Sequence, residues 1–121
     1  MFTGKNPFKI MRQTWNPGGW EIETLEAPRV MTHDDAQMIA FDPNDAGHRV
    51  VTLPAPRKGA WFWIFNHAGA AENLLLRQAD GTTVVGTVNQ DESALVFCPA
   101  DDEDAGTTGW SLLAVVAISL S

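Results

Sequence analysis

Few residues of this chain have the types and spacing that catalysis requires. The three histidines, His33, His48 and His67, lie far apart, and none belongs to a His-x-His or His-Glu-x-x-His pattern, the short spacings that metalloenzymes use. The single cysteine, Cys98, ends an apolar run and has no histidine or lysine nearby to activate its thiol. We expect a protein that is not an enzyme, with no catalytic residue, cofactor or metal. A small β-barrel enzyme is the alternative if the three histidines meet around a metal.

An acidic run at residues 101–104, Asp-Asp-Glu-Asp, is the other place where ligand chemistry could occur. Calcium takes about six to eight oxygen ligands, which an EF-hand loop supplies at fixed positions. In the frame that begins at Asp101, Ala105 takes the third ligand position and no distal glutamate follows. We expect a solvated acidic loop from Asp101 to Asp104, with a cation held between subunits as the alternative.

Charge and hydropathy limit the possible partners. The formal net charge is −7, whereas nucleic-acid contacts need clustered lysine and arginine. The longest apolar stretch, residues 112–120, has about half the length of a membrane-spanning helix. The basic first residues precede no signal-peptide core, and a single cysteine suits a reducing compartment. We expect no nucleic-acid partner, no membrane partner and synthesis in the cytoplasm.

Residues 1–19 differ from the rest of the chain. They show no sustained strand or helix period and contain Pro7, Pro17 and the pair Gly18-Gly19, which interrupt regular structure. They carry basic residues and no acid. We expect an extended arm that lies on its own domain, on a neighbouring copy or on another protein. The alternative is that the three basic residues simply belong to a solvated terminus. Its candidate partner-binding residues are Phe2, Lys5, Phe8, Lys9, Arg12 and Trp15.

Residues 20–121 are predicted to form one all-β domain, a small antiparallel β-sandwich or barrel of jelly-roll or β-tulip type. Apolar or alternating runs recur about every ten residues between turn residues, as in sandwiches and barrels. Asp80-Gly81 predicts a hairpin turn, Gly86 a bulge or a close backbone approach, and residues 33–39 one or two helical turns. The candidate strands are residues 20–25, 29–32, 37–41, 48–53, 60–66, 73–77, 82–85, 93–98 and 110–119.

Tryptophan is abundant for a chain of this length. Trp61 and Trp63 are two residues apart, so they share one face of their strand, with Phe62 and Ile64 on the other face. The run is continuous and apolar, which favours burial on both faces. We expect Trp61, Trp63 and Trp110 in the core or at an interface between subunits, where aromatic side chains act as anchors. If Trp61 or Trp63 is exposed, stacking on a sugar is the alternative.

Several short motifs lie between residues 50 and 113, about half of the chain. Together they resemble the small capsid decoration, or cement, proteins of tailed double-stranded-DNA phages. Other virion β-domains show the same order of motifs. The matching residues are Thr52-Leu53-Pro54, then Gly59 with Phe62, Ile64 and Asn66, then Asp80-Gly81, and finally Gly109-Trp110.

The resemblance implies a homotrimer that sits on the outside of the capsid of a virion. There it would bridge major capsid protein subunits and stiffen the shell against the pressure of the packaged DNA. The alternative is a tail-fibre or other receptor- or carbohydrate-binding β module.

Overall fold

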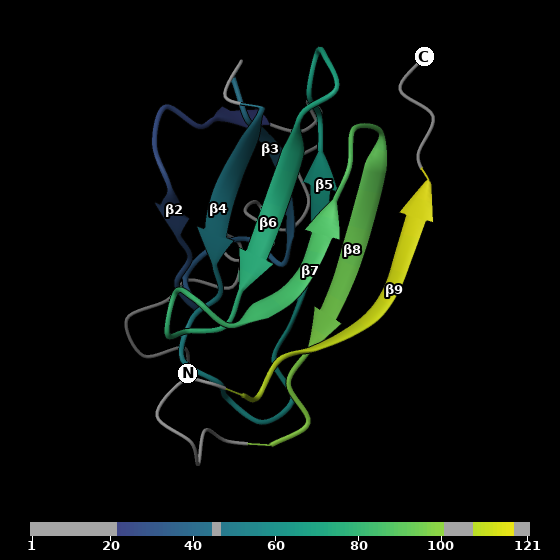
Figure 1. Ribbon diagram of the computed structural model, residues 1–121. Coiled ribbons are helices and arrows are strands. Elements are labelled where there is room, and N and C mark those ends of the chain that lie inside the picture. The colour runs from purple at the N-terminus through teal and green to yellow at the C-terminus, as the bar shows by residue number, and fades with distance from the viewer. Residues whose placement is uncertain (1–21, 45–46, 101–107, 118–121) are drawn as a thin grey trace, which may run out of the picture.

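The structure is a computed structural model that describes residues 22–44, 47–100 and 108–117. Within these ranges the chain forms nine strands and no helix, so the all-β prediction is confirmed (Figure 1). The strands are β1 (Ile22–Thr24), β2 (Arg29–Val30), β3 (Met38–Asp42), β4 (His48–Thr52), β5 (Trp61–Asn66), β6 (Asn73–Arg77), β7 (Val84–Val88), β8 (Glu92–Phe97) and β9 (Ser111–Ala117).

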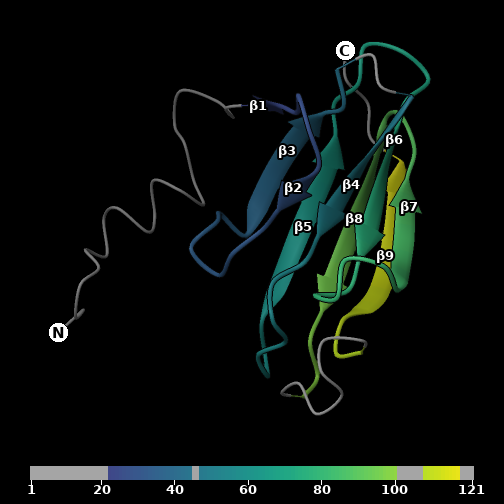
Figure 2. The same cartoon turned by 60° about the vertical axis from the view of Figure 1, so that its left-hand side comes forward.

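The strands form two mixed sheets, which Figure 2 shows as two layers. The five-stranded sheet has the order β1-β3-β5-β8-β9 and the four-stranded sheet the order β2-β4-β6-β7. From β1 to β6, consecutive strands alternate between the sheets, so the chain returns to each sheet in the same direction and β1-β3-β5 and β2-β4-β6 are parallel. The expectation of a purely antiparallel domain is therefore wrong. The antiparallel pairs are β5 with β8, β6 with β7 and β8 with β9.

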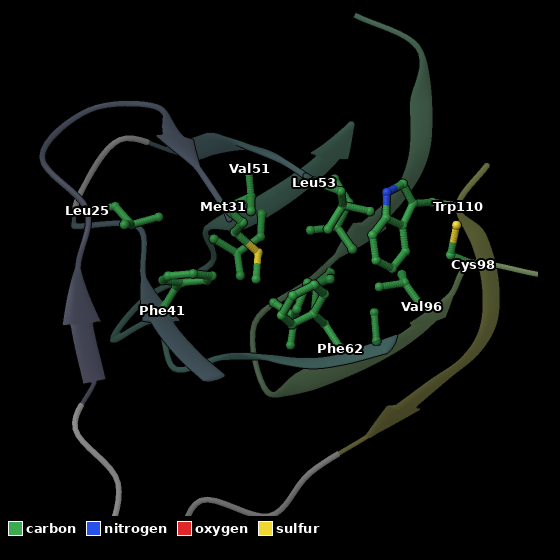
Figure 3. Packing of buried hydrophobic residues seen from close by; sticks show 14 residues of the cluster. Leu25, Met31, Phe41, Val51, Leu53, Phe62, Val96, Cys98 and Trp110 are labelled. Atoms are coloured by element: carbon green, nitrogen blue, oxygen red, sulfur yellow. The ribbon is translucent and has the colours of Figure 1, made fainter. Parts of the chain in front are cut away.

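The hydrophobic core lies between the two sheets (Figure 3). Strand side chains alternate between faces, so β5 buries Phe62 and Ile64 while its other face stays partly exposed, and β6 buries Leu74 and Leu76 in the same way. The cluster joins residues of both sheets and of the loops between them: Leu25, Met31, Phe41, Val51, Leu53, Phe62, Ile64, Leu74, Leu76, Val88, Ala94, Val96, Cys98 and Trp110.

The turn between β6 and β7 follows its predicted chemistry. Gly81 has a φ of 78°, which a glycine adopts without strain. The Asp80 carboxylate accepts hydrogen bonds from the Thr83 hydroxyl and from the backbone N–H groups of Thr82 and Thr83. These bonds lower the pKa of Asp80 to about 2, because they favour the ionised form.

Gly86 in β7 lies beside the bulge that was predicted for it, and its close neighbour is a side chain rather than another backbone. The register between β6 and β7 shifts beside it, between Leu76 and Arg77. A Cβ atom at Gly86 would also lie 2.9 Å from Cδ2 of Leu112 in β9. The glycine therefore leaves room for the end of the Leu112 side chain.

Residues 33–39 form no helix, contrary to expectation. Instead, the Asp35 N–H donates to the Thr32 carbonyl and the Asp35 carboxylate accepts from the Thr32 N–H, local bonds that compete with a helix. The Arg29 guanidinium of β2 forms ion pairs with two carboxylates. Its Nε lies 2.6 Å from Oε2 of Glu23 in β1, and its Nη2 lies 2.7 Å from Oδ1 of Asp35. Hydrogen bonds to these two carboxylates, first Glu23 and then Asp35, raise the pKa of Arg29. Because β1 and β2 belong to different sheets, the Arg29–Glu23 pair links the sheets at that edge.

Trp110 closes the core where β9 begins. Its indole Nε1 donates to the Pro54 carbonyl at 2.8 Å, and its backbone N–H and C=O both bond to the Gln78 amide. Gly109 precedes it with a φ of 114°, where a Cβ would lie 2.4 Å from Cγ of Pro56. With 4% of its surface exposed, Trp110 is a core residue.

Candidate binding surface

The outer face of the five-stranded sheet carries a group of large apolar side chains, here called the aromatic face. Its centre is β5, where Trp61, Trp63 and Phe65 all point away from the core. The register places neighbours from the adjacent strands on the same face: Met38 of β3 and Leu95 of β8 flank Trp63, and Phe97 of β8 lies beside Trp61. All of these side chains are partly exposed. The aromatic face comprises Met38, Trp61, Trp63, Phe65, Leu95 and Phe97.

A hydrogen bond and a ring contact hold Trp63 in place on the aromatic face. Its indole Nε1 donates to the Ser93 hydroxyl at 2.9 Å, and this hydroxyl donates to the Val116 carbonyl at 3.3 Å. The ring centroids of Trp63 and Phe65 are 5.1 Å apart, with an angle of 35° between the planes, within the range of favourable aromatic pairs. Because the indole N–H is bonded inside the protein, the ring offers mainly carbon to a partner.

The outer face of the four-stranded sheet is different. Polar and charged side chains alternate there with smaller apolar ones, so the described strands of that sheet form no comparable aromatic group. A contiguous apolar patch on one face commonly marks a site of interaction with another molecule. The polar residues of the four-stranded face are His48, Thr52, Asn73, Arg77 and Thr87.

The structure separates the three tryptophans that were predicted as core or interface residues. Trp110 lies in the core, whereas Trp61 and Trp63 lie on the aromatic face. The expectation that β5 is buried on both faces is therefore wrong, because the second sheet covers one face only. The predicted arm, residues 1–19, and the acidic run, residues 101–104, lie outside the described residues.

Sequence reasoning missed four members of the aromatic face. Phe65 has the same parity as Trp61 and Trp63, so alternation along the strand could have assigned it. Met38, Leu95 and Phe97 carried no comparable signal, since their face depends on the register with β5.

His33 and Cys98 have structural surroundings, whereas His48 and His67 are exposed. His33 hydrogen-bonds the Ala55 carbonyl at 2.6 Å, and its ring stacks on Phe62 and Trp110. The Cys98 side chain is fully buried, as predicted, and its thiol donates to the Ala100 carbonyl at 3.0 Å. Within residues 22–44, 47–100 and 108–117, no three His, Cys, Asp or Glu side chains are grouped to hold a metal ion.

The motif residues that carry the phage resemblance have structural roles in this domain. Leu53, Phe62 and Ile64 are core residues, and Gly59 has a φ of 85°. Asn66 is fully buried and hydrogen-bonded to backbone groups. These residues therefore serve the packing and turns of this β domain, and the aromatic face lies outside them.

No model of a known protein family matches the chain, and no curated protein sequence matches it. In the part of the chain that the structure describes, no helix is long and apolar enough to span a bilayer.

Proposed function

We propose that this protein is a non-enzymatic virion structural protein that binds the outside of a phage capsid. It acts as a homotrimer that bridges major capsid protein subunits and stabilises the shell. The finer architecture that we propose is a jelly-roll or barrel-like sandwich with residues 1–19 as an extended arm. The resemblance over residues 50–113 and the all-β domain of two sheets support this assignment.

The aromatic face is the observation that carries the proposal. Protein interfaces are enriched in tryptophan, phenylalanine and methionine and poor in charge at their centre, and the aromatic face has this composition. Burying a large apolar side chain contributes about 1.5–3 kcal/mol when it starts from full exposure. These side chains start partly exposed, so each contributes less, and several together are needed for stable attachment.

In this proposal the arm adds to the same attachment. Phe2, Phe8 and Trp15 supply apolar anchors, and Lys5, Lys9 and Arg12 give the arm a positive charge on a chain with a net charge of −7. An acidic capsid surface would attract such an arm. Ordering it costs about 1–2 kcal/mol per residue in backbone entropy, so the arm binds only if several anchors act together.

Co-sedimentation with purified capsids of the phage that encodes the chain tests the proposal. The wild-type protein should sediment with the capsids in a saturable manner. Trp61→Ala should weaken binding about tenfold or more, since truncating an interface tryptophan commonly costs 2 kcal/mol or more. Deleting residues 1–19 should leave a folded domain that binds more weakly.

The matched control for Trp61→Ala is Val84→Ala, on the outer face of the four-stranded sheet. Val84 is 63% exposed, so its truncation also removes an exposed apolar group. Capsid binding should be unchanged in this variant. A wild-type protein that does not sediment with capsids at micromolar concentration would refute the proposal.

A tail-fibre or other carbohydrate-binding module is the second candidate function. The partial exposure of Trp61 and Trp63 favours it, because exposed indole rings can stack on sugars. Binding of the protein to glycans of the host surface, weakened by Trp61→Ala, together with no binding to capsids, would establish this candidate instead.

A further inference from the structure

Strand β9 (Ser111–Ala117) is exposed along its whole length. Exposure is 38% for Leu112, 58% for Leu113, 42% for Val115 and 46% for Val116. Large aliphatic side chains in the middle of a strand are normally covered, so this strand leaves an unusual amount of apolar surface in water.

Both faces of β9 are apolar. The register with β8 pairs Val115 with Ala94, on the core side of the sheet, and Val116 with Ser93, on the side of the aromatic face. Leu112 reaches Gly86 of β7. Figure 1 shows β9, in yellow, at the margin of its sheet, with β8 on one side and no described strand on the other.

The opposite edges of the two sheets are protected in ways that β9 is not. Proteins usually keep edge strands short or charged, which prevents pairing with other chains. β1 has three residues and carries Glu23, and β2 has two residues and carries Arg29. β9 has seven residues and contains no charged residue, proline or glycine. The remaining edge strand, β7, is also uncharged, but it is shorter and contains Gly86, beside which the register with β6 shifts. Within the described residues β9 is therefore the strand edge best suited to an intermolecular contact.

From this geometry we infer that β9 is the contact surface between copies of this chain. The inference rests on the proposed function, which requires a homo-oligomer, and it assigns the surface that joins the subunits. A chain with a net charge of −7 repels its own copies, so copies can approach most easily where neither presents a charge.

The composition of β9 favours a second copy of this chain over a charged partner. A basic partner would find no carboxylate on β9 to pair with, whereas an apolar, uncharged strand is complementary to itself. In a ring of three, each subunit also contacts two neighbours and needs two contact surfaces. A strand that is apolar on both faces meets that need.

Native mass spectrometry and sedimentation of the full chain test this inference. The wild-type protein should be oligomeric at micromolar concentration. Leu113→Lys and Val116→Lys should each weaken association about tenfold or more, the scale of losing an interface anchor. Both substitutions lower the net negative charge of the chain, so a rise in the overall repulsion between copies cannot explain a dissociation.

Val30→Lys and Val84→Lys are the matched controls. These valines are 65% and 63% exposed and lie on the four-stranded sheet, so they undergo the same change of charge and hydrophobicity outside β9. Both variants should associate like the wild type. Far-UV circular dichroism checks that every variant keeps its β structure.

Hydrogen exchange of the wild-type protein provides a measurement that does not depend on the folding of a variant. The amides of β9 should be protected at high protein concentration and should lose that protection on dilution, while those of β5 remain protected. A wild-type monomer, folded β9 variants that associate like the wild type, or β9 exchange that is independent of concentration would overturn the inference.

These outcomes are separate from those that test the proposed function. An oligomer that dissociates in the β9 variants but never binds capsids supports the inference and refutes capsid binding. A wild-type dimer that behaves in the same way supports the β9 contact and refutes the trimer.

Discussion

Replacing Asn66 with aspartate should strongly destabilise the domain, although the two side chains have nearly the same shape. Asn66 lies at the end of β5 and is fully buried. Its Nδ2 donates to the carbonyls of Glu72 (2.8 Å) and Val88 (2.9 Å), and its Oδ1 accepts from the Ala68 N–H at 3.0 Å. A single amide thus joins β5 of one sheet to the residue before β6 and to the end of β7 in the other.

The expected magnitude follows from those bonds. A carboxylate can still accept from Ala68, but it cannot donate to the two carbonyls, and it places a negative charge beside them. Each lost bond to a buried partner costs roughly 1–3 kcal/mol, and burying the charge adds to this. We expect a loss of about 3–6 kcal/mol, a large part of the 5–15 kcal/mol typical of a domain.

Urea denaturation at neutral pH measures this loss. With a slope of roughly 1–3 kcal/mol per molar for small proteins, the midpoint should fall by more than about 1 M. Asn73→Asp is the control, because it is the same chemical change at a partly exposed position of β6. It should shift the midpoint little.

The pH dependence of the Asn66→Asp variant provides an independent check. Burial disfavours the charged form and raises the pKa of the new carboxyl group above its ordinary value of about 3.9. The destabilisation should therefore be smallest below that ordinary value and grow as the pH rises towards the folded-state pKa. Equal midpoints for Asn66→Asp and Asn73→Asp would refute the role assigned to this amide.

The remaining predictions concern a glycine, an exposed carboxylate and the thiol. Gly109→Ala should lower the melting temperature by several degrees, since its φ is 114° and the new Cβ would meet Pro56, whereas Gly69→Ala should not, because nothing lies within 4 Å of its Cβ position. The pKa of Asp80, measured by NMR titration, should be about 2. Because this pKa is below the ordinary value for aspartate, ionised Asp80 stabilises the fold at a pH above that ordinary value. This contribution should be lost as the pH falls towards 2. Thr83→Val should raise this pKa, because it removes the largest stabilising bond. The Cys98 thiol should react slowly with a thiol reagent in the native state and quickly in urea, since it is fully buried; rapid native labelling would contradict the structure.

The individual strands could be predicted because their signals are local. Residues 73–77 were assigned as a strand with the observed bounds, since an apolar run ends at a charged residue before the Asp80-Gly81 turn. The pairing could not be predicted in the same way. Strands separated by short runs of turn residues suggest hairpins. Strands β1 to β6 instead alternate between the two sheets. This alternation depends on long-range packing, which no local signal reports.

Part of the candidate site was also accessible from sequence. Alternation placed Trp61 and Trp63 on one face of a strand, but which face the second sheet covers is a property of the whole fold. Trp110 is of a residue type that often anchors interfaces, yet it lies in the core, because the Pro54 carbonyl accepts a hydrogen bond from its indole N–H. The exposure of β9 was not predicted either, since an apolar strand usually indicates burial.

Electron cryomicroscopy of virions tests the central claim most directly. In the proposed function the chain is encoded by a phage, and the virions of that phage should be imaged with the protein present and after it has been deleted. We predict density for a three-fold β-domain oligomer on the outer capsid surface, seated between major capsid protein subunits and absent from the deletion. Capsids that look the same with and without the protein, or density confined to the tail, would contradict the account.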